Sequence, residues 1–153
     1  MMDGLNFRKL AIVTVGVPCS GKSTWADEFV AARENWVKIE RDEIRMKLFG
    51  LDDYSLYRHC KDNEQLVTNC FNQLLQVCAD GNLNVVSADT NINPKFRKQL
   101  LTKLEDLGYD VKIKKFHVSL EEALERNKHR DGKFIPEDII QNMQARFIDQ
   151  FGE

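Results

Sequence analysis

The residues from Gly16 to Ser23 have the types and the spacing needed to bind a chain of phosphates. They read Gly-Val-Pro-Cys-Ser-Gly-Lys-Ser and match every fixed position of the pattern G-x-x-x-x-G-K-[ST]. Glycine tolerates the backbone angles that turn successive N–H groups toward phosphate oxygens. In such a loop Lys22 reaches the β- and γ-phosphates, and the hydroxyl of Ser23 holds Mg²⁺. The motif therefore predicts a site for a nucleoside triphosphate and Mg²⁺.

The segments on either side of this loop fit a working phosphate site. A short apolar, β-branched run over 10–15 predicts a buried strand, and apolar residues at helical spacing predict a helix over 24–32. The N-terminus of that helix would add a dipole that favours anions. The residues expected to contact the nucleotide here are Gly16, Ser20, Gly21, Lys22, Ser23 and Thr24, with the Thr24 hydroxyl near the α-phosphate.

A second group of charged residues lies between Glu40 and Arg45, after a strand expected over 36–40. Asp42 and Arg45 are three residues apart at the start of a predicted helix, so they share one face. Beside a γ-phosphate, Asp42 can accept the proton of an attacking hydroxyl as a general base. Arg45 is suited to bidentate capture of a phosphate on the same acceptor molecule. The alternative is an N-cap aspartate with a helix-surface salt bridge.

Asp89 and Thr90 follow the third expected strand, over 83–89. Loop-type NTPases keep a carboxylate at this position near Mg²⁺ or its waters, which makes Asp89 a candidate metal and substrate residue. Thr90 could donate a hydrogen bond to a substrate phosphate. The alternative is an Asx turn ahead of the helix that Asn93-Pro94 opens.

The segment from Arg126 to Lys133 is dense in positive charge and contains a glycine. A solvated helix end is the ordinary interpretation of such a run. Beside a nucleotide, a mobile arginine closing over the phosphates would neutralise developing charge and exclude water. Arg130 is the first candidate for this role and Arg126 the second.

Strand-like and helix-like segments alternate along the chain, which is typical of a parallel sheet flanked by helices. We expect an α/β fold with a four-stranded parallel sheet, helices on both faces and a short basic lid, formed by a single domain over 1–153. Ligands in such sheets bind beyond the carboxyl ends of the strands. The expected strands are 10–15, 36–40, 83–89 and 111–118, and the expected helices are 24–32, 42–48, 56–79, 94–107, one that starts after Ser119 and one that Pro136 opens.

The composition favours one soluble domain in the cytoplasm. The net charge of −2 argues against a protein that coats nucleic acid by charge alone, although it allows a small basic pocket for a strand end. No apolar run is long enough for a spanning helix, and Met1 to Gly4 lack the features of a signal peptide. The four cysteines show no zinc-binding spacing, and reduced, packed thiols are expected.

Four segments in this order resemble the bacteriophage 5′-polynucleotide kinases, and the resemblance covers essentially the whole chain. They are residues 16–25 (GVPCSGKSTW), 41–45 (RDEIR), 89–94 (DTNINP) and 126–130 (RNKHR). The resemblance implies a P-loop kinase fold and transfer of the ATP γ-phosphate to the 5′-hydroxyl end of DNA or RNA, with Mg²⁺.

By this resemblance, Lys22 and Ser23 bind the donor and Asp42 is the general base. Arg45 would bind the phosphate 3′ to the acceptor nucleoside. Asp89 would support the site, and Arg130 would contact the β-phosphate of the donor from the lid.

The chain departs from this family in two respects. The best known members carry a C-terminal domain that removes 3′-phosphates, and no such domain is encoded here, so we expect a stand-alone kinase or an excised domain. Glu40 also replaces the uncharged polar residue expected before Arg41. A carboxylate there would repel a phosphate backbone and narrow the range of acceptors.

Two alternative functions remain open at the level of sequence. A small-molecule kinase on the same scaffold would act on a nucleoside, a nucleotide or a sugar, and would not need Arg45 to meet a 3′-phosphate. A nucleotide-dependent switch would usually have a glycine after the magnesium-binding aspartate, which the run Asp89-Thr90-Asn91-Ile92 lacks.

Overall fold

The sheet has four parallel strands, β1 (Lys9–Val15), β2 (Trp36–Ile39), β3 (Asn84–Ser87) and β4 (Tyr109–Lys115), in the order β2-β3-β1-β4. The computed structural model describes residues 8–153, so Met1 to Gly4 lie outside the described residues. In the sheet, Ala11 on β1 is paired with Val85 on β3 and with Val111 on β4. The neighbours β2 and β3 are consecutive in the chain, whereas β1 lies between β3 and β4. Because every pair is parallel, each connection must cross over a face of the sheet, as the alternation of segments predicts. Within the described part of the chain, no helix has the length and apolar character needed to cross a membrane.

The strands lie where the sequence predicts them, with some differences at their ends. The predicted extension of the fourth strand to residue 118 is wrong, because pairing with β1 ends when β1 turns into the phosphate loop after Val15. The third strand stops at Ser87 for a similar reason, since Thr14 Oγ1 donates to the Ser87 and Asp89 carbonyls and turns the chain there.

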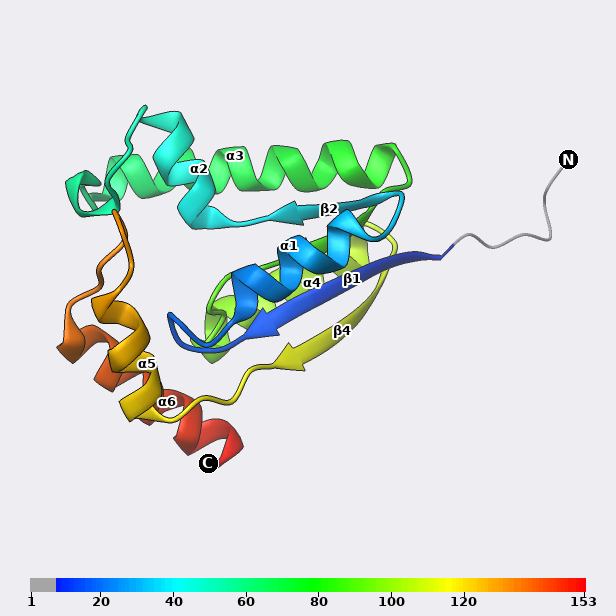
Figure 1. Ribbon diagram of the computed structural model, residues 1–153. Helices are drawn as coiled ribbons and strands as arrows, with labels where there is room; N and C mark the ends of the chain where they lie inside the picture. Colours follow the sequence, from blue (N-terminus) through cyan, green and yellow to red (C-terminus); the bar gives the residue numbers. More distant parts are fainter. Residues whose placement is uncertain (1–7) are drawn as a thin grey trace, which may run out of the picture.

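Helices cover both faces of the sheet (Figure 1). They are α1 (Lys22–Ala31), α2 (Arg41–Leu48), α3 (Lys61–Asp80), α4 (Pro94–Asp106), α5 (Leu120–Lys128) and α6 (Glu137–Phe151), with a 3₁₀ turn η1 (Tyr54–Leu56) before α3. The predicted caps of α4 and α5 are confirmed: the Asn93 side chain accepts from two N–H groups of the first turn of α4, and Ser119 accepts from the N–H of Glu122.

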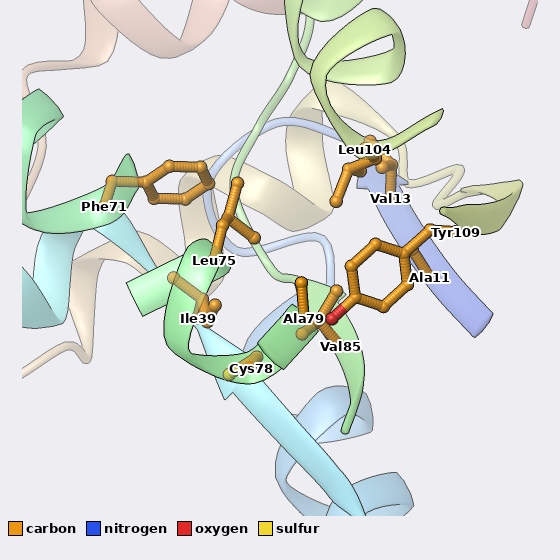
Figure 2. Close-up of a cluster of buried hydrophobic side chains, with 10 residues drawn as sticks. All are labelled: Ala11, Val13, Ile39, Phe71, Leu75, Cys78, Ala79, Val85, Leu104 and Tyr109. Atoms are coloured by element: carbon orange, nitrogen blue, oxygen red, sulfur yellow. The ribbon is translucent and has the colours of Figure 1, made fainter. Parts of the chain in front are cut away.

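The core lies on the face of the sheet covered by α3 and α4. Figure 2 shows its buried side chains, which come from all four strands and from both helices. They are Ala11, Val13, Ile39, Phe71, Leu75, Cys78, Ala79, Val85, Leu104 and Tyr109. On the other face, Ala26 of α1 packs against Val86 and Ala88. The sheet is thus fixed between two apolar layers, which holds the carboxyl ends of its strands in place.

The start of α3 differs from the prediction, which began a helix at Leu56. The chain is extended at Tyr57 and Cys60, and the helix begins at Lys61. Tyr54 and Tyr57 are buried, and the Tyr57 hydroxyl reaches Glu64 on the first turn of α3 at 2.5 Å. This packing requires the chain to leave helical geometry between the two elements.

Apolar residues recur at helical spacing along α3 and α6, and this spacing predicts that Leu66, Leu74 and Ile139 are buried. The prediction is wrong for these three residues, which are exposed. The buried residues of α3 are Val67, Phe71, Leu75, Cys78 and Ala79. The buried stripe is therefore narrower than the predicted one, because the helix meets the sheet along one row of side chains.

Candidate active site

The phosphate loop joins β1 to α1 and has the backbone conformation that its glycines permit. Gly21 has a φ of 98°, and a Cβ on Gly16 would lie 3.0 Å from the Cβ of Phe116. Both positions therefore favour glycine, one for backbone angle and one for space. The N–H of Gly16 donates to the Thr90 carbonyl at 3.0 Å, which ties the loop to the end of β3.

Lys22 is buried and lies folded back on the loop. Its Nζ donates to the Val17 carbonyl at 3.0 Å. Burial lowers the pKa of Lys22 to about 8, although the negative charge of Glu40 counteracts this. Ser20 Oγ in the same loop is buried and has no hydrogen-bond partner within the described part of the chain. An unsatisfied hydroxyl beside a desolvated ammonium fits a site for phosphate oxygens.

Ser23, at the start of α1, contacts a carboxylate from the end of β2. Its Oγ donates to Glu40 Oε2 at 3.1 Å, and Glu40 is only 5% exposed. Lys133 from the lid reaches Glu40 Oε1 at 3.3 Å, and Lys38 lies 3.5 Å from Oε2. Glu40 therefore lies beside the phosphate loop, whereas the sequence predicts only an effect of its charge on the acceptor.

Asp42 lies in the first turn of α2 between two cations. Its Oδ1 accepts from Arg45 Nη1 at 2.8 Å, and its Oδ2 lies 3.0 Å from Lys133 Nζ. Burial alone would raise the pKa of Asp42, but Lys133, Arg45 and the Tyr54 hydroxyl together hold it below its usual range. The side chain is thus an ionised carboxylate, the form that can accept a proton.

Arg45 is held in place from both sides. Its Nε and Nη2 donate to the two oxygens of Glu64 at 3.0 and 2.7 Å, and its Nη1 donates to Asp42. Tyr57 donates to the same Glu64. Asp42 and Arg45 share one face of α2, as predicted, and they form the salt bridge that the alternative interpretation expects, while Glu64 orients the guanidinium through a bidentate pair.

Asp89 and Thr90 lie at the end of β3, close to the loop, as their positions in the sequence suggested. Asp89 Oδ1 accepts from the N–H of Arg41 at 2.8 Å. Burial raises the pKa of Asp89 to about 7, and the negative charges of Asp42 and Glu40 add to the effect. No hydrogen bond joins Asp89 to Ser23 among the described residues. A role for Asp89 or Thr90 in binding substrate stays a prediction.

The basic segment 126–133, which is the lid, comprises the last residues of α5 and the chain that follows them, and it lies at one side of the site. Arg126 Nη1 donates to the Cys19 carbonyl of the phosphate loop at 3.0 Å. Nη1 of Arg130 is buried and, within residues 8–153, has no hydrogen-bond partner. The Gly132 carbonyl accepts from the N–H of Tyr54 at 2.6 Å, so the segment also touches the turn before α3. In Figure 1 this stretch runs from α5 toward that turn.

One pocket of about 420 Å³ brings these parts together. It is lined by residues from the phosphate loop, β2, α2 and the lid, which are Ser23, Asp27, Lys38, Glu40, Asp42, Glu43, Met46, Lys47, Arg130 and Lys133. The predicted residues Ser23, Asp42 and Arg130 therefore face one space. Sequence reasoning missed Glu40 as a loop neighbour, Lys133 and Glu64. Only Glu40 had a signal in the sequence, since it ends a strand beside the phosphate loop.

Comparisons with known proteins agree with this architecture. A protein of Autographa californica nuclear polyhedrosis virus, named "Putative bifunctional polynucleotide kinase/RNA ligase", is 32% identical over 150 residues, which cover 92% of this chain and 21% of that protein. The chain thus spans about a fifth of the length of this relative.

Solved structures share the fold. A chain in the "Structure of the Pnkp1/Rnl/Hen1 RNA repair complex" superposes with a TM-score of 0.81 at 24% identity, covering 99% of this chain and 47% of that one. A gluconokinase from Sinorhizobium meliloti 1021 has a TM-score of 0.61 at 21% identity, covering 95% of this chain and 80% of that one. The fold is that of the P-loop kinases, as the sequence predicts.

The family profile AAA_33, described as "AAA domain", matches residues 12–149. This range includes the phosphate loop, Asp42 and the lid. With so much of the chain matched, we conclude that it belongs to the AAA_33 family of P-loop domains.

Proposed function

We propose that this chain is an ATP-dependent polynucleotide 5′-hydroxyl kinase. The observation that carries the proposal is the ionised carboxylate of Asp42, which faces the same pocket as Ser23 of the phosphate loop and Arg130 of the lid. A proton acceptor beside a phosphate-binding loop is the arrangement that phosphoryl transfer to an alcohol needs.

On the donor side, the loop N–H groups and Lys22 would bind the phosphates of ATP, and Ser23 would hold Mg²⁺. The bound Mg²⁺ would neutralise charge on the phosphates. Lys22 gives up only one backbone carbonyl when it turns to a phosphate. Arg130 has an unsatisfied Nη1 that a phosphate oxygen would satisfy. The predicted contacts of Thr24 and Arg126 with the nucleotide belong to this side of the proposal.

On the acceptor side, the 5′-oxygen attacks the γ-phosphorus while its proton passes to a carboxylate oxygen of Asp42. The bond between the γ-phosphorus and the β–γ bridging oxygen breaks, and ADP leaves with that electron pair. Positioning and charge neutralisation supply most of the rate enhancement in such a transfer. In the proposed transfer, Lys22 and Arg130 would stabilise the charge on the transferring group.

Arg45 still has N–H groups that can donate to a substrate phosphate. A guanidinium has five N–H donors, and Arg45 directs three of them to Glu64 and Asp42. One N–H on each terminal nitrogen therefore remains for an acceptor phosphate. The same arginine orients the general base and offers an anion site beside it, which favours an acceptor with a phosphate close to its reacting hydroxyl.

The named viral relative supports a polynucleotide acceptor, since its name includes a polynucleotide kinase and its matching segment covers most of this chain. The likeness to gluconokinase concerns the fold alone. A small-molecule acceptor is therefore the outcome that the first experiment must separate.

That experiment compares kcat/KM for three acceptors at saturating ATP and Mg²⁺: a nucleoside, the nucleoside 3′-monophosphate and a 5′-hydroxyl oligonucleotide. We expect the two phosphate-bearing acceptors to react well and the bare nucleoside poorly. A preference for the bare nucleoside, or transfer to none of the three, would contradict the proposal.

Removing Arg45 tests the phosphate contact within the same panel. Arg45→Ala should raise KM for the phosphate-bearing acceptors much more than for the nucleoside. Arg33→Ala is the matched control, because Arg33 follows the end of α1, away from the pocket, and donates to the Phe29 carbonyl of that helix. An equal loss for all three acceptors would show that Arg45 acts only by orienting Asp42.

A further inference from the structure

Glu40 and Ser23 place two oxygen donors side by side at the mouth of the phosphate loop. Ser23 Oγ and Glu40 Oε2 are 3.1 Å apart, and they come from two elements held by the core, the start of α1 and the end of β2. Both side chains line the pocket that contains Asp42. Glu40 is buried, so its carboxylate has few alternative positions.

This separation matches the geometry of a magnesium ion. Mg²⁺ takes octahedral coordination with oxygens at 2.0–2.1 Å, so adjacent ligands lie about 2.9–3.0 Å apart. An ion is typically held by one or two carboxylates together with substrate phosphates and waters. No cluster of three or more His, Cys, Asp or Glu side chains suited to a metal occurs in residues 8–153, which agrees with a site completed by the nucleotide.

Asp89, the carboxylate that the sequence suggested for the metal, is less suited to direct binding. One of its oxygens already accepts the N–H of Arg41 at 2.8 Å. The described hydrogen bonds of Ser23 lead to Glu40. Of the two carboxylates, Glu40 is the one in contact with the hydroxyl that a P-loop uses for its metal.

We propose that Glu40 is a direct ligand of the Mg²⁺ that accompanies the nucleotide, in the coordination position next to the Ser23 hydroxyl. This inference rests on the nucleotide-binding part of the proposed function. Lys133 now neutralises Glu40 at 3.3 Å and also contacts Asp42 at 3.0 Å. Bound Mg²⁺ would replace Lys133 as the partner of Glu40, and Lys133 would then be available to Asp42 and the transferring phosphate.

The test measures nucleotide binding, without turnover. Isothermal titration calorimetry gives the affinity for ADP in EDTA and in Mg²⁺, and the ratio of the two is the metal-dependent increment. For Glu40→Gln we expect this increment to fall by about ten- to a hundredfold relative to the wild type. Affinity for ADP in EDTA should be unchanged or higher, because a negative charge near the phosphates is removed, and this measurement also shows that the variant is folded.

Two further variants distinguish ligation from charge. Glu40→Asp keeps the charge but withdraws the oxygens by one methylene, and its increment should also fall below that of the wild type. Glu34→Gln removes an exposed carboxylate in the turn before β2, outside the pocket, and its increment should stay unchanged.

A wild-type increment in Glu40→Gln or in Glu40→Asp would overturn the inference. The inference would also be overturned if Asp89→Asn lost the metal-dependent increment while Glu40→Gln retained it. Failure of the wild type to bind ADP under either condition would instead contradict the proposed function.

Discussion

Two cations from different elements favour the ionised form of the Asp42 side chain. Arg45 is three residues away on α2, and Lys133 comes from the lid. The pair with Arg45 could be predicted from the sequence, since residues three apart on a helix are neighbours. Lys133 and Glu64 could not, because their distances to Asp42 and Arg45 depend on how the lid and α3 pack.

The environment of Asp89 disfavours the ionised form of its side chain. Its pKa in the folded chain is raised to about 7, while that of an aspartate in an unfolded chain is near 4. Between these values the folded state binds more protons, so the free energy of unfolding falls as the pH rises from 4 to 7. The burial of Asp89 near other carboxylates therefore makes the folded chain less stable at pH 7 than at pH 4.

Asp89→Asn should remove this cost. The amide is neutral at every pH, and its oxygen can still accept the N–H of Arg41. We expect the variant to be more stable than the wild type by about 1–3 kcal/mol at pH 8 and nearly equal to it at pH 4.5. Urea unfolding at the two pH values measures this, with the exposed Asp149→Asn as control. A gain of the same size at both pH values would contradict the assigned environment.

The lid and the turn before α3 meet in a close backbone contact at Gly132. Gly132 has a φ of 68°, a Cβ placed on it would lie 3.0 Å from the Asp52 carbonyl, and its own carbonyl accepts from Tyr54. Lys133, the next residue, reaches Asp42. The backbone at Gly132 therefore determines whether the lid can bring Lys133 to Asp42.

Gly132→Ala should disturb this approach without unfolding the chain. An alanine in left-handed geometry costs about 1–2 kcal/mol, and its Cβ would press on the turn. We expect kcat/KM to fall by about five- to thirtyfold, in line with that cost. Gly152→Ala, which also has a positive φ but nothing within 4 Å of the added Cβ, should leave the kinetics unchanged. Equal kcat/KM in Gly132→Ala and the wild type would show that the lid contact has no role.

The order and the type of the helices and strands could be predicted from the sequence, whereas some of the residues at which they begin or end, and some of their exposed side chains, could not. The loop at Gly16, the N-cap Asn93 and the capping residue Ser119 are local signals, and the structure has each of them. The break between η1 and α3 arises from tertiary packing of Tyr54 and Tyr57, which no local pattern records. Leu66 and Leu74 are exposed because hydrophobic spacing does not tell how wide a helix–sheet contact is.

For the whole molecule, the charge distribution limits how a polynucleotide can bind. The net charge is −2, and the four carboxylates that line the pocket are balanced by four cations, Lys38, Lys47, Arg130 and Lys133. The pocket therefore has no excess of positive charge to attract a long stretch of phosphates, and the proposed acceptor contact is a single phosphate on Arg45. We therefore infer that the chain grips the end of a strand rather than its length.

Salt dependence measures this directly. For single strands, the logarithm of the binding constant falls with the logarithm of the salt concentration by about 0.7 per contacted phosphate. With one or two phosphates contacted, we expect a slope for the oligonucleotide KM between about 0.7 and 1.4 at saturating ATP. Lengthening the oligonucleotide beyond a few residues should change KM little. A slope steeper than about 3 would indicate an extended phosphate track and contradict this view.

In the proposed reaction, Asp42 takes the proton of the acceptor hydroxyl. The most direct measurement is the single-turnover rate of γ-phosphate transfer from ATP to a 5′-hydroxyl oligonucleotide by the wild type, Asp42→Asn and Glu34→Gln, a control that removes an exposed carboxylate outside the pocket. We predict that Asp42→Asn binds ADP normally but transfers phosphate about 10²–10⁴-fold more slowly, while the control stays near the wild type. Transfer by Asp42→Asn within about threefold of the wild type would contradict the account, because general-base loss has a much larger effect.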